Sequence, residues 1–469
     1  MSRLISARLV GLFAVVLLAA GVASGGDWED ESFITQDPVV QYVTRVATGP
    51  DDALYVLWLD WTDWEDTKIT LMMSPDKGET WNGPWIAFDG MPYDNAAICA
   101  NEQGLHLLFT EYFEDEEEEY KWLYCANSTD GGETFAEPVR VGERDNIEAV
   151  DAFTYGDVLF VYAQNMDWEF EIIYSYLYVS RDGGGTWEEK PLLPWDTVEH
   201  PTFAVVDGVI HMAFGRYEFA PRIRYCRSTD DGDTWTTPVA VSQGAGPHAQ
   251  LAQIAVADEA LVVAWEDDRS NYFNIVYSRS TDDGATWSSD LQLNDTFYGA
   301  RPKLLTDEEG LHAVWCQYHG DSGWPASWSS ADYGIIRYKF SDDSGLTWGD
   351  EFRVSQNEHI DPMDLPQQGA SYVRLGEYDT GFCAVWQDKR DGNIDLYMRN
   401  NLGPPALGDL NCDGIVNNFD IRAFVLALTD EAGYADAYPD CDRDLADVNG
   451  DGAVNNFDIS PFVDLLTGG

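Results

Sequence analysis

One eight-residue motif recurs six times along the chain and limits the folds that the chain can adopt. Each copy begins with Ser, has Asp, Gly and Thr at its third, fifth and seventh positions, and ends in Trp or Phe. The copies begin at Ser74, Ser128, Ser180, Ser228, Ser280 and Ser341, with spacings of 54, 52, 48, 52 and 61 residues. A period near 50, with short strand-like runs between turn signals, is typical of a β-propeller, in which each blade is one antiparallel sheet.

A second repeat gives an independent count of the blades. Seven strand-like runs carry an aromatic residue followed two positions later by a polar one: "ALYVLWLD", "LHLLFTE", "VLFVYAQ", "VIHMAFGR", "LVVAWED", "LHAVWCQ" and "FCAVWQD". The sequence therefore predicts an all-β propeller of seven blades, or of six if one unit is degenerate.

The last unit lacks the eight-residue motif and stops after its third expected strand, "GNIDLYMRNN". The segment "ESFITQDP" near the N-terminus is similar to "EFRVSQNEHIDP", which precedes the last unit. We therefore expect an N-terminal strand, about Glu31 to Gln36, to complete the last blade and to remove an exposed sheet edge.

Turn chemistry explains the motif. In "STDDGDTW", Ser228 and Asp230 can bond to their own backbone, Gly232 tolerates positive φ, and Trp235 can anchor the hairpin tip. The motifs are Asp boxes, and with them residues 27–400 resemble the sialidase-like propellers with bacterial neuraminidase (BNR) repeats. That family places its boxes between third and fourth strands, opposite the active site, so we expect the boxes to be structural.

Function is then expected on the other face, where strand two leads to strand three and each innermost strand begins. The polar residues after the repeated aromatics would form a ring there: Asp60, Glu111, Gln164, Arg216, Asp267, Gln317 and Asp388. Nearby loops add Trp61, Asp63, Trp64, Trp168, Tyr217, Tyr272, Tyr318, His319 and Trp324, and the strand starts add Tyr93, His200, His248, Tyr298, Arg301 and His359. Aromatic rings mixed with carboxylates suit sugars, which predicts a glycan ligand on this face, although such residues also serve ordinary packing.

The resemblance implies glycoside hydrolase activity as a candidate function. Sialidases use three arginines, a Tyr and Glu pair and an Asp acid/base. The sequence departs from that pattern: it has no "RIP" tripeptide, and Arg45 stands in a different context. Arg269 and Arg390 occupy equivalent places in "WEDDR" and "WQDKR", which favours loop bracing against Asp267 and Asp388. The candidate catalytic or ligand-binding residues are Arg216, Arg301, Asp60, Glu111, Asp267 and Asp388.

After a linker, residues 401–408, the chain repeats itself in "DLNCDGIVNNFDIRAFVLAL" and "DVNGDGAVNNFDISPFVDLL". Each copy opens with a twelve-residue loop of calcium type, with oxygen ligands at alternate positions and a central Gly. The expected ligands of two calcium ions are Asp409, Asn411, Asp413, Ile415 (carbonyl), Asn417 and Asp420, and then Asp447, Asn449, Asp451, Ala453 (carbonyl), Asn455 and Asp458.

A helix should follow each loop, with apolar faces made by Ile421, Phe424, Val425 and Leu428, and by Ile459, Phe462, Val463 and Leu466. With these loops, residues 409–469 resemble a type I dockerin, the α-helical module that attaches secreted enzymes to cohesins. The resemblance implies a cohesin as partner, although another cell-surface protein is an alternative. The selecting positions in that family carry Asn-Phe here rather than Ser-Thr: Asn418 with Phe419, and Asn456 with Phe457.

Cysteine usage fits an exported chain. Cys412 and Cys441 are alone in the small domain and are expected to form a disulfide. Buried thiols are expected for Cys99, Cys125, Cys226, Cys316 and Cys383, with a pair between the first two as an alternative.

The N-terminus and the net charge indicate the location of the protein and the partners that it is unlikely to bind. Residues 1–26 have the composition of a secretory signal peptide, which predicts a secreted or cell-surface protein without a membrane span in its mature form. With 27 Lys and Arg against 83 Asp and Glu, the net charge of −56 would repel nucleic acid. Two readings of function result: a secreted, sialidase-like exo-glycosidase acting in glycan breakdown, or a noncatalytic propeller that binds glycans or proteins.

Overall fold

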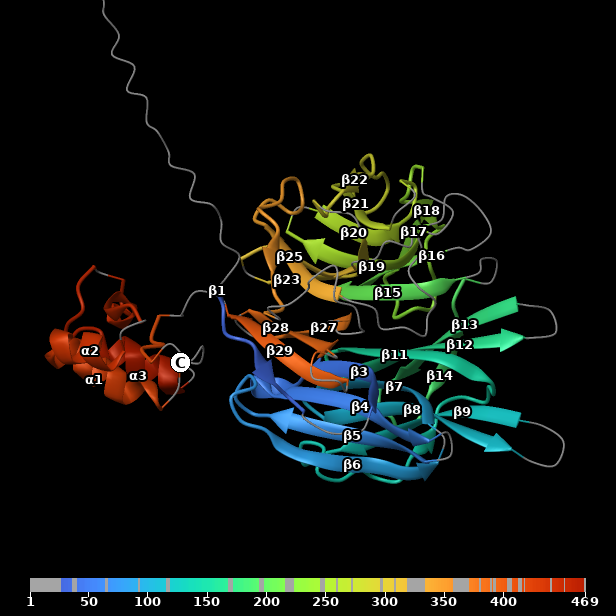
Figure 1. Ribbon diagram of the computed structural model, residues 1–469, viewed down its shortest axis with the longest axis horizontal. Helices are drawn as coiled ribbons and strands as arrows, with labels where there is room; N and C mark the ends of the chain where they lie inside the picture. The colour runs from blue at the N-terminus through green and yellow to red at the C-terminus, as the bar shows by residue number, and fades with distance from the viewer. Residues whose placement is uncertain are drawn as a thin grey trace, which may run out of the picture.

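The computed structural model describes residues 27–467. Within that span it leaves out 36–39, 64–65, 92, 115–118, 168–171, 194–197, 216–222, 245–248, 259, 271–272, 296–297, 308, 319–333, 357–370, 379–380, 389, 391–393, 403–406, 412–415, 417, 439–440 and 451. Seven antiparallel sheets follow one another along the described chain and form the seven blades of a propeller (Figure 1).

Blades 1 to 6 each contain four strands in chain order, running outward from the innermost strand. Blade 1 is β3 (Val40–Thr48), β4 (Leu54–Asp63), β5 (Asp66–Ser74) and β6 (Asn82–Met91). Blade 2 is β7 (Tyr93–Asn101), β8 (Gly104–Glu114), β9 (Glu119–Ser128) and β10 (Val139–Arg140). Blade 3 is β11 (Ile147–Tyr155), β12 (Val158–Asp167), β13 (Ile172–Ser180) and β14 (Glu188–Pro191).

The next three blades repeat the arrangement. Blade 4 is β15 (Glu199–Val206), β16 (Val209–Gly215), β17 (Ile223–Ser228) and β18 (Val239–Ala240). Blade 5 is β19 (Gln250–Ala257), β20 (Ala260–Asp267), β21 (Asn274–Ser280) and β22 (Leu291–Gln292). Blade 6 is β23 (Gly299–Thr306), β24 (Leu311–Tyr318), β25 (Gly334–Ser341) and β26 (Phe352–Arg353).

The seventh blade is closed by the start of the chain, as predicted. It contains β27 (Ser371–Glu377), β28 (Phe382–Asp388) and β29 (Asp395–Leu402), and two short N-terminal strands, β1 (Asp27–Trp28) and β2 (Ser32–Phe33), pair with β29. The closing segment begins earlier than the expected Glu31, because Trp28 packs edge-on against Tyr338 and Phe382. The ring is therefore closed by residues from both ends of the propeller.

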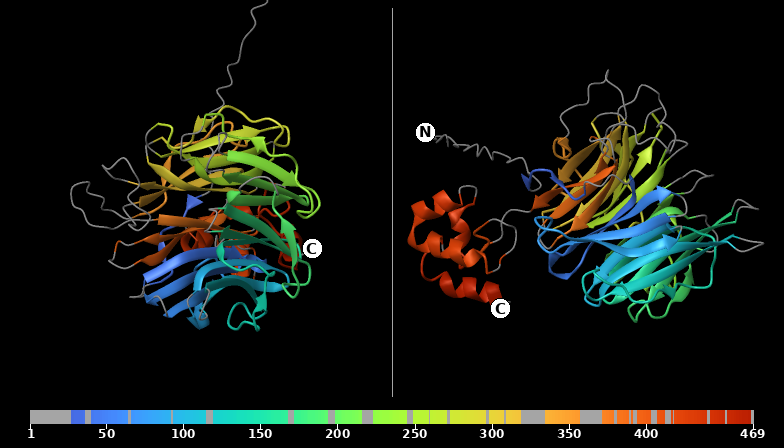
Figure 2. Two further views of the ribbon diagram at one scale, coloured as in Figure 1. Left: turned by 90° about the vertical axis from the view of Figure 1, so that its right-hand side faces the viewer. Right: turned by 60° about the horizontal axis from the view of Figure 1, so that its bottom comes forward.

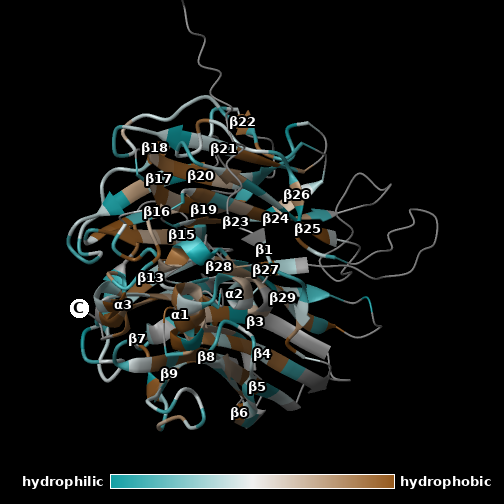
Figure 3. Ribbon diagram, turned by 90° about the vertical axis from the view of Figure 1, so that its left-hand side faces the viewer, coloured by the Kyte–Doolittle hydropathy of each residue, from teal (hydrophilic) through white to brown (hydrophobic). Residues whose placement is uncertain are grey.

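The core lies between neighbouring blades. The second and third strands are nearly continuous runs of buried residues, and the largest fully buried side chains include Trp265, Trp315 and Trp386 at equivalent positions of blades 5 to 7. Figure 3 shows the hydrophobic residues along the strands and the hydrophilic ones in the turns. All five propeller cysteines are buried thiols outside any disulfide, so the alternative pair of Cys99 and Cys125 does not form.

Three short helices and the 3-10 turn Arg443–Ala446 make up the described C-terminal part (Figure 2): α1 (Asp420–Thr429), α2 (Glu431–Ala437) and α3 (Ile459–Thr467). Another 3-10 turn, Pro50–Asp52, connects β3 to β4 in blade 1. The two predicted helices are confirmed in position. Only part of each predicted apolar face is buried, because Phe424 stacks on Phe462 at 3.9 Å between ring centroids while Ile421, Val425, Ile459 and Val463 are exposed. Cys441 is disulfide-bonded, and its expected partner, Cys412, lies outside the described residues.

The six Asp boxes connect third to fourth strands and make the same bonds. In the fourth box, Ser228 Oγ donates to Asp230 Oδ1 at 2.8 Å and accepts from Gly232 N at 2.9 Å. The Asp230 carboxylate also accepts from the amide and hydroxyl of Thr234. The box carboxylates are thus occupied within their own turns, as turn chemistry predicts.

These bonds predict acid sensitivity. Hydrogen bonds from Thr134 and Ser128 lower the pKa of Asp130 to about 2, against about 3.9 in an unfolded chain. The stabilisation from its charge is present above about pH 4 and is lost as pH falls through about 2. We expect Asp130→Asn to be less stable than the parent at pH 5, with the gap closing toward pH 2 in denaturant unfolding. Asp157→Asn, in the exposed β11–β12 turn, is the control; a gap that did not depend on pH would contradict the assignment.

Candidate functional site

The end of the propeller opposite the boxes carries the start of each innermost strand and the end of each second strand. In blade 5, for example, Gln250 at the start of β19 pairs with Glu266 near the end of β20. This end was expected to carry function, and its polar residues divide into structural and candidate binding groups.

Most of the predicted polar ring is used structurally. The repeated aromatic donates to the polar residue two positions later in two blades: Trp58 Nε1 to Asp60 Oδ1 at 2.7 Å, and Trp265 Nε1 to Asp267 Oδ2 at 3.0 Å. In blade 6, Arg337 Nε donates to Gln317 Oε1 at 2.7 Å. In these blades the polar residue of the repeat fixes a strand end, whereas the equivalent indole nitrogens of Trp315 and Trp386 are buried without a hydrogen bond.

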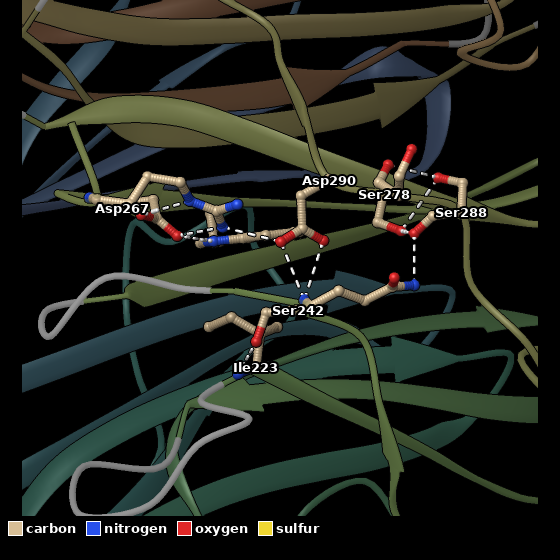
Figure 4. Close-up of polar contacts among 10 residues, drawn as sticks. Ile223, Ser242, Asp267, Ser278, Ser288 and Asp290 are labelled. Carbon is tan, nitrogen blue, oxygen red and sulfur yellow. Dashed lines mark hydrogen bonds and ion pairs between the residues drawn. The ribbon is translucent and has the colours of Figure 1, made fainter.

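The two repeated arginines brace loops, as predicted. Arg269 Nη2 lies 2.6 Å from Asp267 Oδ2 and 2.9 Å from Asp290 Oδ2. The Asp290 carboxylate also accepts from the Gln243 amide, which links blade 5 to the last turn of blade 4 (Figure 4). Arg390 pairs in the same way with Asp388 and with Glu31 of the closing segment. Asp267 and Asp388 are thus engaged by arginine, which opposes a catalytic role for either.

Backbone strain marks the innermost strands at this end. Every innermost strand has an irregularity in its register near its start, and in blades 4 to 7 the residue there has positive φ: His200 at 45°, Leu251 at 51°, Arg301 at 54° and Tyr372 at 56°. Such strain in non-glycine residues is uncommon and often re-aims side chains beside functional sites. Arg301 and Tyr372, in blades 6 and 7, are two of these four strained residues.

Arg301 and Tyr372 come together at these bulges. The Arg301 guanidinium lies over the Tyr372 ring, 3.6 Å from its centroid. Its amide donates to Glu266 Oε1 at 2.5 Å, and Gln250 Nε2 donates to Glu266 Oε2 at 3.2 Å. We call Gln250, Glu266, Arg301 and Tyr372 the rim cluster; it joins blades 5, 6 and 7.

The rim cluster combines groups that a polar ligand could use. Glu266 is 5% exposed, and burial raises the pKa of its carboxyl. A raised pKa means that the protonated form of a carboxyl persists to higher pH than usual. Burial also raises the pKa of Glu111, in blade 2. Sequence reasoning found Arg301 and Glu111 but missed Glu266 and Tyr372, whose only signal is their place beside the bulges.

Many of the predicted rim residues fall outside the part of the chain that the structure describes. Outside the described residues lie Arg216, Trp64, Trp168, Tyr217, Tyr272, His319, Trp324, His248 and His359. For Trp61, Asp63, Tyr93 and Tyr318 the structure describes the backbone alone. Tyr298 donates its amide to the Phe273 carbonyl at 2.9 Å, and Gln164 donates to the Val198 carbonyl at 3.5 Å.

The structure describes some of the expected oxygen ligands of the two calcium loops. Asp409, Asp420 and Asp458 are fully buried. Asp420 Oδ1 accepts from the Leu410 and Asn411 amides, Asp458 accepts from the Asn449 and Asn455 amides, and Gly452 at the turn has φ of 83°. Oxygen donors of this kind fit a hard divalent cation.

Four expected ligands, Asp413, Ile415, Asn417 and Asp451, lie outside the described residues. Within the described residues no group of three or more His, Cys, Asp or Glu is placed to hold a metal ion. The same part of the chain contains no helix whose length and apolar character would let it cross a membrane.

Seven blades and six Asp boxes define a BNR-type β-propeller. The model of the BNR repeat-like domain matches residues 89–334, and the chain belongs to that family. No curated protein matches the chain.

Solved structures give low-similarity matches. A protein of unknown function from Dyadobacter fermentans DSM 18053 shares 12% identity, with a TM-score of 0.46 over 80% of this chain and 99% of that one. The Hadza microbial sialidase Hz136 shares 19%, with a TM-score of 0.44 over 59% and 63%. The K499G mutant of NanB sialidase from Streptococcus pneumoniae shares 13%, with a TM-score of 0.43 over 78% and 70%.

Proposed function

We propose that this chain is a secreted carbohydrate-active protein that binds a glycan at the rim cluster. The observation that carries the proposal is the stacking of Arg301 on Tyr372 above the buried Glu266. An aromatic face suits the apolar side of a sugar ring, and a guanidinium beside it can donate to hydroxyl or carboxylate oxygens. The sialidase-like fold of the family is consistent with a glycan-binding or glycoside hydrolase-like role.

Recognition without cleavage is favoured over hydrolysis. Most glycosidases use two carboxyl groups about 5 to 10 Å apart, and sialidases use a Tyr nucleophile with an Asp acid/base. Asp60, Asp267 and Asp388 are engaged by strand-end and loop partners, which opposes an acid/base role for these three residues. One observation favours the second candidate, an exo-glycosidase: Glu266 has the raised pKa expected of a general acid.

The C-terminal part would attach the protein to its partner. We propose that the two loops bind calcium and that residues 409–469 act as a dockerin for a cohesin or another cell-surface protein. Phe419 and Phe457, at equivalent positions of the two repeats, are 77% and 71% exposed. Exposed aromatic residues flanked by exposed Ile and Val side chains form a surface suited to a protein partner.

A glycan array and a release assay with chromogenic glycosides test the rim. We expect Arg301→Gln to weaken glycan binding at least tenfold, because it loses both the charge and the stacked plane. Arg181→Gln is the matched control: Arg181 is exposed at the box end, where it pairs with Asp231 at 2.6 Å. Equal binding by both variants would contradict the site. Turnover that disappears in Glu266→Gln would establish hydrolysis, and binding without turnover would establish recognition.

A further inference from the structure

The two calcium-type loops of the C-terminal part have the same sequence pattern but not the same surroundings. The first loop begins at Asp409 and the second at Asp447. Asp409 is fully buried, whereas Asp447 is only partly buried. The next residues differ in the same direction, because Leu410 is fully buried and Val448 is partly exposed. The start of the first loop is therefore more enclosed than the start of the second.

A tyrosine of α2 bonds to the start of the first loop. The fully buried Tyr434 donates its hydroxyl to the Leu410 carbonyl at 2.9 Å. Burial raises the pKa of this hydroxyl to about 12, so it keeps its proton near neutral pH and remains a donor. The Leu410 amide donates in turn to the expected ligand Asp420 at 2.8 Å. Tyr434 thus holds the backbone from which the first loop presents its ligands.

A disulfide fixes the same loop covalently. Cys441 is disulfide-bonded and the five propeller cysteines are outside any disulfide, which leaves Cys412 as its partner among the chain's seven cysteines. Cys412 is the fourth residue of the first loop, and the fourth residue of the second loop is Gly450. The Cys441 sulfur also lies 3.7 Å from the Asp409 carbonyl oxygen. The first loop is therefore cross-linked to the segment after α2, whereas the second loop contains no cysteine.

The second loop is held by bonds between residues that are close in sequence. Asn455 Nδ2 donates to the Ala453 carbonyl at 2.6 Å, and Asp447 Oδ2 accepts from the Gly452 amide at 2.7 Å. Local bonds of this kind restrict a chain less than a cross-link between distant residues does. The two loops therefore differ in how firmly they are held before a cation arrives.

We propose that the first loop is the tighter of the two calcium sites and that Tyr434 and the Cys441 disulfide make it so, as positioning groups rather than ligands. The inference rests on the proposed binding of calcium by both loops. A loop that must be ordered when it binds a cation loses affinity to that ordering. The first loop is ordered in advance by its two links to the α2 segment, and the second is ordered more at the moment of binding.

Calcium titration of the full mature chain by calorimetry tests the proposal, after bound calcium has been removed with a chelator. We expect two binding steps whose dissociation constants differ at least about tenfold. Asp420→Asn should weaken the tighter step and Asp458→Asn the weaker one, because these carboxylates end the first and second loops. The reverse assignment, or two steps of equal affinity, would overturn the proposal.

Two further variants test the positioning groups. Cys441→Ser removes the disulfide and should weaken the tighter step at least about tenfold, with the weaker step unchanged. Tyr434→Phe keeps the ring but removes the bond to Leu410, and should weaken the same step about tenfold. Tyr438→Phe is the control, because it removes a hydroxyl from the neighbouring ring, 5.4 Å away between centroids, and should bind calcium as the parent does. Equal losses in both steps, or no loss, would contradict these roles.

The inference and the calcium proposal can fail separately. A full chain that takes up no calcium would refute calcium binding and the inference with it. Two calcium steps that respond alike to Cys441→Ser and Tyr434→Phe would leave calcium binding in place and refute only the difference between the loops. Helical circular dichroism at saturating calcium checks that each variant folds, and if Cys441→Ser does not, the comparison of Tyr434→Phe with Tyr438→Phe decides.

Discussion

Deletion of residues 27–35 is expected to lower the free energy of unfolding of the propeller by at least about 5 kcal/mol. Loss of a well-packed Trp costs about 3 to 5 kcal/mol, and Trp28 packs against Tyr338, Phe382 and Phe352. Removing one partner from a largely buried ion pair costs about 3 to 5 kcal/mol, and Glu31, 7% exposed, pairs with Arg390. The two losses overlap, so their sum is an upper bound.

Denaturant unfolding measures this loss of free energy, and single variants show how much of it each residue contributes. Trp28→Ala should account for about 3 kcal/mol or more. Phe33→Ala is the matched control, because Phe33 lies in the same segment but is 49% exposed, and its loss should cost under about 1 kcal/mol. An unchanged unfolding midpoint after the deletion would show that the N-terminal strands do not hold blade 7.

Removal of calcium is expected to unfold the C-terminal helices while the propeller stays folded. A ligand at a thousandfold excess over its Kd stabilises the folded state by about 4 kcal/mol, a large share for a module with one small apolar cluster around Phe424 and Phe462. Calorimetry of the full chain with and without a calcium chelator should show one transition move to lower temperature, together with loss of helical circular dichroism.

A pair of variants tests the ligands themselves. Asp420→Asn retains an oxygen for the Leu410 and Asn411 amides but loses the charge, so we expect its calcium affinity to fall at least tenfold. Asp444→Asn, exposed in the 3-10 turn Arg443–Ala446, should bind calcium as the parent does. If the chelator left both transitions in place, calcium binding by these loops would be refuted.

Repetition made most of the fold predictable. Six boxes and seven aromatic-x-polar runs each report a local turn or strand end, and a periodic array of such units has few ways to bury its faces. The loop bracing by Arg269 and Arg390 could be predicted for the same reason, because a residue repeated in equivalent places of two blades is expected to have a structural role.

The candidate binding residues were harder to predict because they break the repetition. Glu266 and Tyr372 come together with Arg301 only through strained bulges in three neighbouring blades, which no local pattern encodes. The exposure of Ile421 and Val425 could not be predicted, because helical periodicity identifies an apolar face but not what covers it.

Closure by the first strands also sets the order in which the molecule can be completed. Asn400 bonds to Glu29, 371 positions earlier in the chain, so blade 7 cannot form until synthesis has passed β29. Bringing such distant segments together costs about 5 kcal/mol of chain entropy, and non-local pairing of this kind slows folding. Until that moment β29 has an unpaired edge, which makes the nearly finished chain the form most exposed to aggregation.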